Sequence, residues 1–94
     1  MKQYTTPDQT AKLIELGFEK PKNEVKAEQA GDYAWYNPAY SIGELIEIMG
    51  YDLYSMHYLG MSWDVKSERI GTREVELIDA LYDMCIKLKE EGTI

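Results

Sequence analysis

The sequence has few of the side chains from which small reactive centres are built. It contains one Cys, Cys85, and one His, His57, among 94 residues. A single Cys cannot close a disulfide within the chain and cannot supply a Cys-x-x-Cys pair for metal or redox chemistry. The glycines are dispersed and form no G-x-G-x-x-G or Walker A string. The sequence therefore excludes a domain stabilised by internal disulfides, and it contains no recognisable nucleotide-binding motif.

Long apolar runs and positive charge are also scarce. No segment approaches the roughly 20 apolar residues of a membrane-spanning helix, and the opening MKQYTTPDQT lacks the apolar core and cleavage site of a signal peptide. Lys and Arg number 10 against 17 Asp and Glu, a formal net charge of -7. That sign opposes direct binding to nucleic-acid phosphates. We therefore expect a cytoplasmic protein with neither a nucleic acid nor a membrane as its direct partner.

What is present suits one small folded domain. Hydrophobic residues make up 45% and charged residues 29% of the chain, close to the average for soluble globular domains. A chain of this length has room for one modest core. Residues 1–94 are expected to form a single domain.

Capping motifs predict two short helices. TPDQ at residues 6–9 is a capping box with Pro at the first helical position, and Gly17 is a suitable C-cap after a helix that reaches about Leu16. SIGE at residues 41–44 is a second capping box, followed by a short amphipathic helix that ends at Gly50. Each pattern predicts both ends of its helix.

A longer helix is expected at the C-terminus, with Thr72 as its cap and about Glu91 as its end. Its apolar residues cover more than half of the circumference, which is wider than one sheet face needs. We expect this helix to pack on the hairpin described next and also on the first helix, the second helix or a second subunit.

Residues 53–59 and 62–68 flank Gly60 and form a predicted β-hairpin with a type II′ turn. If Leu59 lies opposite Ser62, one register separates an apolar face from a polar face. The apolar face, expected to be buried, pairs Tyr58 with Trp63, Met56 with Val65 and Tyr54 with Ser67. The polar face pairs His57 with Asp64 and Ser55 with Lys66.

The remaining segments complete the predicted fold. Residues 19–32 are polar without an apolar period, which is typical of a surface loop, and the aromatic residues 33–36 before Asn37-Pro38 favour a short edge strand. The predicted class is α+β. A two- or three-stranded antiparallel sheet, made of the hairpin with or without the edge strand, is packed by an N-terminal, a short middle and a long C-terminal helix.

The middle of the chain is acidic and rich in aromatic residues. Residues 31–65 contain five acidic residues, no Lys or Arg, and most of the Tyr and Trp residues. Tyr and Trp give a large contact area at a low cost in side-chain entropy, so this composition favours a recognition surface. The alternative is that these rings form the core of a protein with a single Phe. The interface candidates beside the predicted loop are Tyr33, Trp35, Tyr36 and Tyr40.

Other groups of residues contain side chains of the kinds found in reactive sites, but their predicted positions do not suit catalysis. His57 and Asp64 with two nearby Ser residues resemble the members of a nucleophilic triad, yet the outer face of a hairpin lacks a concave, dry site. An exposed cross-strand ion pair is the simpler interpretation. Asp79 and Asp83, one turn apart on the last helix, are expected to be a solvated face, and Cys85 to be buried among apolar residues. We identify no catalytic residue, metal site or cofactor.

Three blocks of the sequence together resemble a known group of proteins. They are KLIELGF at residues 12–18, YSIGELIE at 40–47 and ELIDALYDM at 76–84. In this order they are similar to small phage- or prophage-encoded proteins of gut Bacteroidetes and some Firmicutes. The resemblance implies an accessory gene of a mobile element, expressed inside a bacterial host cell. It implies no activity and no functional residue at any position.

The function that we expect is a non-enzymatic protein–protein interaction module, with a homo-oligomer such as a homodimer as one mode of association. Two alternatives stay open. One is an acidic DNA mimic that inhibits a nucleic-acid-binding protein of the host, suggested by the net charge of -7. The other is a small hydrolase or metal enzyme that uses His57 and Asp64.

Overall fold

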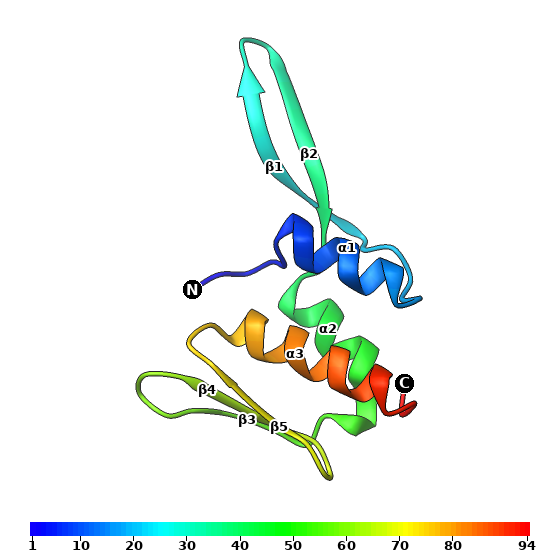
Figure 1. Ribbon diagram of the computed structural model, residues 1–94. Coiled ribbons are helices and arrows are strands. Elements are labelled where there is room, and N and C mark those ends of the chain that lie inside the picture. Colours follow the sequence, from blue (N-terminus) through cyan, green and yellow to red (C-terminus); the bar gives the residue numbers. More distant parts are fainter.

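Helices and two antiparallel sheets share the chain, and the predicted α+β class is confirmed (Figure 1). The computed structural model describes the backbone of residues 1–94 and the side chains of residues 1–27 and 30–94. In chain order the elements are α1 (Pro7–Glu15), β1 (Asn23–Ala30), β2 (Tyr33–Ala39), α2 (Ile42–Met49), a 3-10 turn η1 (Gly50–Asp52), β3 (Ser55–Tyr58), β4 (Trp63–Lys66), β5 (Gly71–Glu74) and α3 (Leu77–Glu90).

The elements are stacked along the long axis of a molecule that measures 48 × 32 × 17 Å. The sheet β3-β4-β5 lies at one end, α3 lies across it, α2 packs on α3, and α1 with the β1–β2 ribbon lies beyond (Figure 1). Among the described residues, no helix is long and apolar enough to cross a membrane. The stack therefore has a body of helices and sheet at one end and a projecting ribbon at the other.

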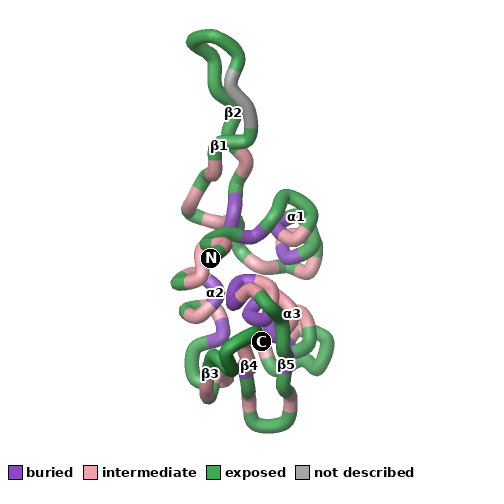
Figure 2. Tube along the Cα trace, turned by 90° about the vertical axis from the view of Figure 1, so that its left-hand side faces the viewer, coloured by how far each residue is buried: buried purple, intermediate pink, exposed green. Residues whose placement is uncertain are grey.

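The core is built around α3, whose apolar side chains are buried between the sheet and α2 (Figure 2). The wide apolar arc expected of this helix is present, and α2 is its second partner within the chain. Buried side chains from the neighbouring elements complete the core: Leu13, Tyr40, Leu45, Met49 and Val65. Most of the arc is thus covered within the chain, and Tyr82 and Ile86 are partly buried at its margin.

Both short helices begin and end close to where their caps predict. Thr6 and Gln9 form the capping box of α1, and Gly17, with φ of 100°, ends the helix. The N–H of Phe18 then donates to the carbonyl of Leu13 at 3.2 Å, which is the hydrogen bond of a Schellman C-cap. The capping box of α2 is also confirmed, and Gly50 follows this helix with a positive φ of 53°.

The predicted hairpin register is confirmed for the four pairs from Ser55–Lys66 to Tyr58–Trp63. The expected pair of Tyr54 with Ser67 is not part of this ladder, because the N–H of Tyr54 donates to the carbonyl of Lys66 at 2.9 Å. The burial expected from the register is only partly correct. Val65 is fully buried, whereas Tyr54 and Tyr58 are 63% and 59% exposed. The reason is that α3 packs over β4 and β5, so that β3 lies at the open edge of the sheet.

The prediction that the last helix begins at Thr72 is wrong. Thr72 lies in β5 opposite Val65, and α3 starts at Leu77. A tight turn, in which the N–H of Ser67 donates to the carbonyl of Ile70 at 2.8 Å, returns the chain along β4. Pairing with β4 provides hydrogen bonds along one edge of β5. It also buries Thr72, whose hydroxyl donates to the carbonyl of Ala80 at 2.8 Å. The third strand of the sheet is therefore β5.

Two further expectations for the segment before α2 are corrected. Residues 23–30, expected to be loop, form β1, and β2 runs past Pro38 to Ala39 and pairs with β1 rather than with the hairpin. The sequence of β1 is polar and lacks the alternation of apolar and polar residues that marks a half-buried strand. For this reason the segment was predicted to be a loop. Pro38 is tolerated because β2 is an edge strand, in which a residue without an N–H can face away from the ladder.

Candidate functional site

The β1–β2 ribbon projects from the body (Figure 1) and carries three exposed aromatic residues. Its strands are joined by the turn Gly31-Asp32, and its distal part is exposed (Figure 2). Tyr33, Trp35 and Tyr36 are 76%, 53% and 55% exposed. Because side chains alternate along a strand, Tyr33 and Trp35 lie on one face and Tyr36 on the other. Three of the four interface candidates therefore lie on this projecting ribbon.

The ribbon leaves apolar side chains in water on an element that has little stability of its own. A two-stranded hairpin without a covering layer is only marginally stable in water. A buried Tyr or Trp removes roughly 150–250 Å² from water, and more than half of each of these three side chains remains in solvent. The apolar area that they leave in water is available to a binding partner.

The fourth candidate, Tyr40, is not part of this surface. Its side chain is 1% exposed, and its hydroxyl donates to the backbone carbonyl of Glu19. Its backbone N–H donates to the Thr5 hydroxyl at 3.0 Å, and its carbonyl accepts from the N–H of Thr5 at 3.0 Å. Burial, with the nearby negative charge of Glu44, raises the pKa of Tyr40. Tyr40 thus fixes the base of the ribbon in the body.

Glu44 is a second anchor at the ribbon base. Its carboxylate accepts hydrogen bonds from the backbone N–H of Lys22 at 2.9 Å, from the Asn23 side chain and from the N–H of Ser41 at 3.2 Å. Burial alone would raise the pKa of Glu44, but these hydrogen bonds outweigh it and the pKa is lowered. The same side chain therefore completes the cap of α2 and holds the start of β1.

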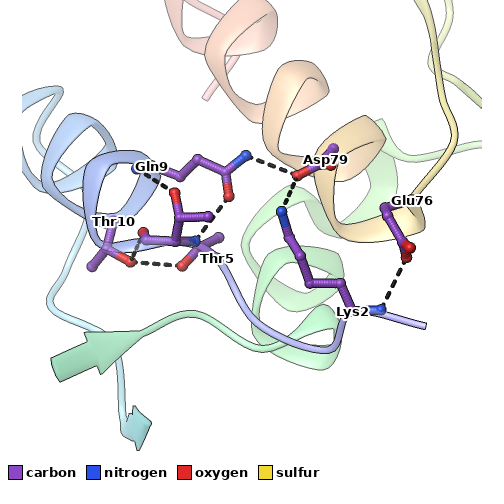
Figure 3. A network of polar contacts seen from close by, with 7 residues as sticks. Lys2, Thr5, Gln9, Thr10, Glu76 and Asp79 are labelled. Carbon is purple, nitrogen blue, oxygen red and sulfur yellow. Dashed lines mark hydrogen bonds and ion pairs between the residues drawn. The ribbon is translucent and has the colours of Figure 1, made fainter. Parts of the chain in front are cut away.

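A third set of contacts ties α1 and the N-terminal segment to α3 (Figure 3). The Asp79 carboxylate pairs with the Lys2 ammonium at 2.8 Å and accepts from the Gln9 amide at 2.9 Å. The backbone N–H of Lys2 donates to Glu76 at 2.9 Å. Burial would raise the pKa of Asp79, but the bonds from Lys2 and Gln9 lower it. The helix beneath the ribbon is thereby bonded to the core helix.

Asp79 and Asp83 do not form the common solvated face expected of them. Asp79 is engaged as described, whereas Asp83 lies beside Glu74 of β5. Burial, followed by the hydrogen bond and the negative charge of Glu74, raises the pKa of Asp83 to about 6. The two carboxyl groups therefore have pKa values shifted in opposite directions, lowered for Asp79 and raised for Asp83.

The residues of the hydrolase alternative lie on the outer face of the sheet. His57 is exposed opposite Asp64, and the Asp64 carboxylate lies 3.6 Å from the Lys66 ammonium. This face is turned away from α3. Within the described side chains, no group of three His, Cys, Asp or Glu residues is arranged to hold a metal ion. Cys85 is fully buried, and burial raises the pKa of its thiol to about 12.

A second exposed apolar surface lies on β3. We call Tyr54, Met56 and Tyr58 the β3 face; their side chains are 63%, 37% and 59% exposed. The ring of Tyr58 packs against that of Trp63 with centroids 5.2 Å apart. This face adjoins the core through Trp63 and is open toward the free edge of the sheet.

Comparison of the chain with known protein families, with curated proteins and with solved structures finds no match. The two surfaces and their anchors are therefore the basis for any functional proposal. Sequence reasoning missed the anchoring role of Glu44, which the capping box alone explained, and it missed β1. The signal for β1 was the Gly31-Asp32 pair before an aromatic strand, a two-residue turn of the kind that joins hairpins.

Proposed function

We propose that the protein is a non-enzymatic interaction module that binds a protein partner through the β1–β2 ribbon. The observation that carries the proposal is the exposure of Tyr33, Trp35 and Tyr36 on an element that projects from the body while its base is anchored. Anchoring lowers the entropy that binding must remove, and Tyr and Trp are the residues that most often dominate binding energy at interfaces.

The chemistry of the ribbon indicates what kind of partner it fits. Residues 33–43 carry no charged side chain, and the whole chain has a net charge of -7. A protein surface with an apolar cleft and a basic rim suits these rings and this charge, whereas a phosphate backbone would be repelled. β2 pairs with β1 alone in a two-stranded sheet, and the outer edge of such a strand can accept a strand from a partner.

The resemblance to phage- and prophage-encoded proteins supplies the proposed setting. In that setting the partner is a protein of the bacterial host cell or of the mobile element itself, met in the cytoplasm. The apolar arc of α3 was one reason to expect self-association. Most of it is covered within the chain, so we place any homodimer contact on another surface.

The test is capture from a bacterial lysate on the immobilised chain, followed by calorimetric titration with the purified captured protein. The variants are Trp35→Ala and the pair Tyr33→Ala with Tyr36→Ala. The matched control is Tyr51→Ala, because Tyr51 is 101% exposed and lies outside the ribbon. We expect at least about tenfold weaker binding for the ribbon variants and unchanged binding for the control.

Binding that survives both ribbon variants would contradict the proposal. If the surviving partner were a nucleic-acid-binding protein whose binding weakens steeply with salt, the DNA-mimic alternative would be favoured instead. Capture of no partner at all would also count against the ribbon as a binding element.

A further inference from the structure

The outer strand of the three-stranded sheet has an open hydrogen-bonding edge. The N–H of Leu59 donates to the carbonyl of Ser62 at 2.8 Å, so these residues are a hydrogen-bonded pair of the hairpin. Hydrogen-bonded and non-hydrogen-bonded pairs alternate in an antiparallel ladder. The main-chain N–H and C=O groups of Met56 and Tyr58 therefore point away from β4, toward the free edge of β3.

This edge lacks the charged residues that normally protect a sheet from pairing with another chain. The opposite edge strand, β5, carries Arg73 and Glu74, both exposed. By contrast, residues 53–63 contain no Asp, Glu, Lys or Arg. In a chain with a net charge of -7, an uncharged segment is where two copies approach each other with the least repulsion.

We propose that β3 pairs antiparallel with β3 of a second copy, about a two-fold axis that passes by His57. In this register Met56 lies opposite the partner's Tyr58, and Tyr58 opposite the partner's Met56. The outward main-chain groups of these residues then donate to and accept from one another. His57 lies opposite the partner's His57 on the polar face. This inference goes beyond the proposed function, since it uses a surface remote from the ribbon.

The register is favoured because the exposed edge is complementary to itself. The outward main-chain groups belong to Met56 and Tyr58, which stand symmetrically on either side of His57. An axis through Met56 would instead require the N–H of Tyr54, which already donates to the carbonyl of Lys66 at 2.9 Å. The two-fold axis by His57 leaves none of these groups unpaired.

The space between the two copies suits the β3 face. Strands lie about 4.8 Å apart, so the two β4 strands of the dimer would be separated by three such spacings, roughly 14 Å. Because α3 packs over β4 and β5, helices of about 10 Å diameter leave a groove above the paired β3 strands. The Tyr54, Met56 and Tyr58 side chains of both copies would fill it.

The surface area buried between the two copies indicates how tightly the dimer should associate. Four residues of β3 and three partly exposed side chains per copy bury roughly 1,000 Å² in total, below the usual 1,200–2,000 Å² of stable complexes. The dimer should therefore be reversible and depend on concentration over a range of about 1 µM to about 1 mM.

The test uses charge at the two-fold axis. Like charges directly opposite each other in a sheet repel, and opposite charges attract. Sedimentation is measured for the full chain, for His57→Lys, for His57→Asp and for an equal mixture of the two variants. His57 is exposed, so neither substitution enters the core. Because His57→Asp also faces Asp64 of its own hairpin, urea unfolding of both variants checks that the hairpin stays folded. Tyr51→Lys and Tyr51→Asp place the same charges on a fully exposed side chain outside the sheet.

We expect a dimer for the unaltered chain, at least about tenfold weaker dimerisation for each His57 variant alone, and recovery of the dimer in the mixture. The Tyr51 variants should dimerise as the unaltered chain does. A monomer at all concentrations, or a dimer that ignores both His57 variants, would overturn the proposal, as would a mixture that stays monomeric.

Amide hydrogen exchange gives a second readout that needs no substitution. The N–H groups of Met56 and Tyr58 should exchange more slowly as concentration rises, while amides of β2 do not change. A ribbon variant such as Trp35→Ala should keep the dimer. Loss of the dimer in Trp35→Ala with normal behaviour of the His57 variants would assign self-association to the ribbon and refute pairing through β3.

Discussion

The Glu44 carboxylate accepts a hydrogen bond from the backbone N–H of Lys22 at 2.9 Å, although the two residues are separated by 21 others in the chain. One side chain thereby couples the first turn of α2 to the residue that precedes β1. Since Asn23, the first residue of β1, bonds to the same carboxylate, the ribbon leaves the body at a defined point. Hydrogen bonds at the base restrict the directions in which the ribbon can point, and such preorganisation lowers the entropy cost of binding.

Removal of this anchor should destabilise the fold. For Glu44→Ala we expect a loss of about 1–2 kcal/mol in the free energy of unfolding, because a cap contact and two further hydrogen bonds disappear. Glu44→Gln, which keeps an acceptor oxygen, should lose less. The measurement is urea unfolding followed by circular dichroism. Glu47→Ala, at an exposed position of the same helix, is the control and should change stability by under about 0.5 kcal/mol.

Local signals in the sequence predicted those elements that local chemistry determines. The caps of α1 and α2 rest on side chains that bond within one turn, and the register of β3 with β4 follows from the turn and the alternation of polarity. Such features need no knowledge of distant residues, and all three are confirmed.

The errors concern elements that depend on distant contacts. Thr72 has the residue type of a helix cap, but pairing with Val65 of β4 draws it into a strand. Tyr54 and Tyr58 have the pattern of a buried face, yet whether they are covered depends on where α3 lies. β1 was missed because a polar strand lacks the apolar alternation that marks a strand, whereas the strand predicted at residues 33–36 is present within β2. Of the predicted interface, Tyr33, Trp35 and Tyr36 are exposed, whereas Tyr40 is buried.

Stability should depend on pH in two opposite directions. The pKa of Asp83 is raised from 3.8 to about 6 by burial and by Glu74, with Asp79 adding to the shift and Lys87 opposing it. The folded state thus binds this proton more tightly than the unfolded chain, and stability should rise as pH falls from about 7 to about 4. Glu44 and Asp79 have lowered pKa values, so their stabilisation is lost below about pH 4.

Thermal unfolding between pH 3 and pH 8 should therefore give a maximum between about pH 4 and pH 6. Asp83→Asn should raise the stability at pH 8 and remove most of the rise between pH 7 and pH 4. A profile of the unaltered chain that is flat from pH 8 to pH 5, or an Asp83→Asn variant with the same profile, would show that the Asp83–Glu74 contact does not hold the proton.

The Cys85 thiol should be unreactive in the folded protein. It is fully buried, and burial raises its pKa to about 12, so neither access nor thiolate is available at pH 8. We expect labelling by a chromogenic disulfide reagent to be at least about a thousandfold slower than in urea, with a rate that follows global unfolding. Rapid labelling without denaturant would place the thiol in a locally opened region. Cys85→Ser should cost about 1–3 kcal/mol, because it buries a hydroxyl in an apolar site.

Substitution of the two Trp residues should affect stability differently, because one is exposed on the ribbon and the other packs against the core. Trp35 is 53% exposed on the ribbon, whereas Trp63 is partly buried against the core and against the ring of Tyr58. Trp35→Ala should change the free energy of unfolding by less than about 0.5 kcal/mol, and Trp63→Ala should lower it by about 2–3 kcal/mol. Single-Trp variants give the matching spectra: Trp63→Phe should emit as a solvated indole and Trp35→Phe at shorter wavelength. A Trp35→Ala variant that unfolds as readily as Trp63→Ala would mean that the ribbon ring supports the fold, and would remove the reason to assign it to a partner.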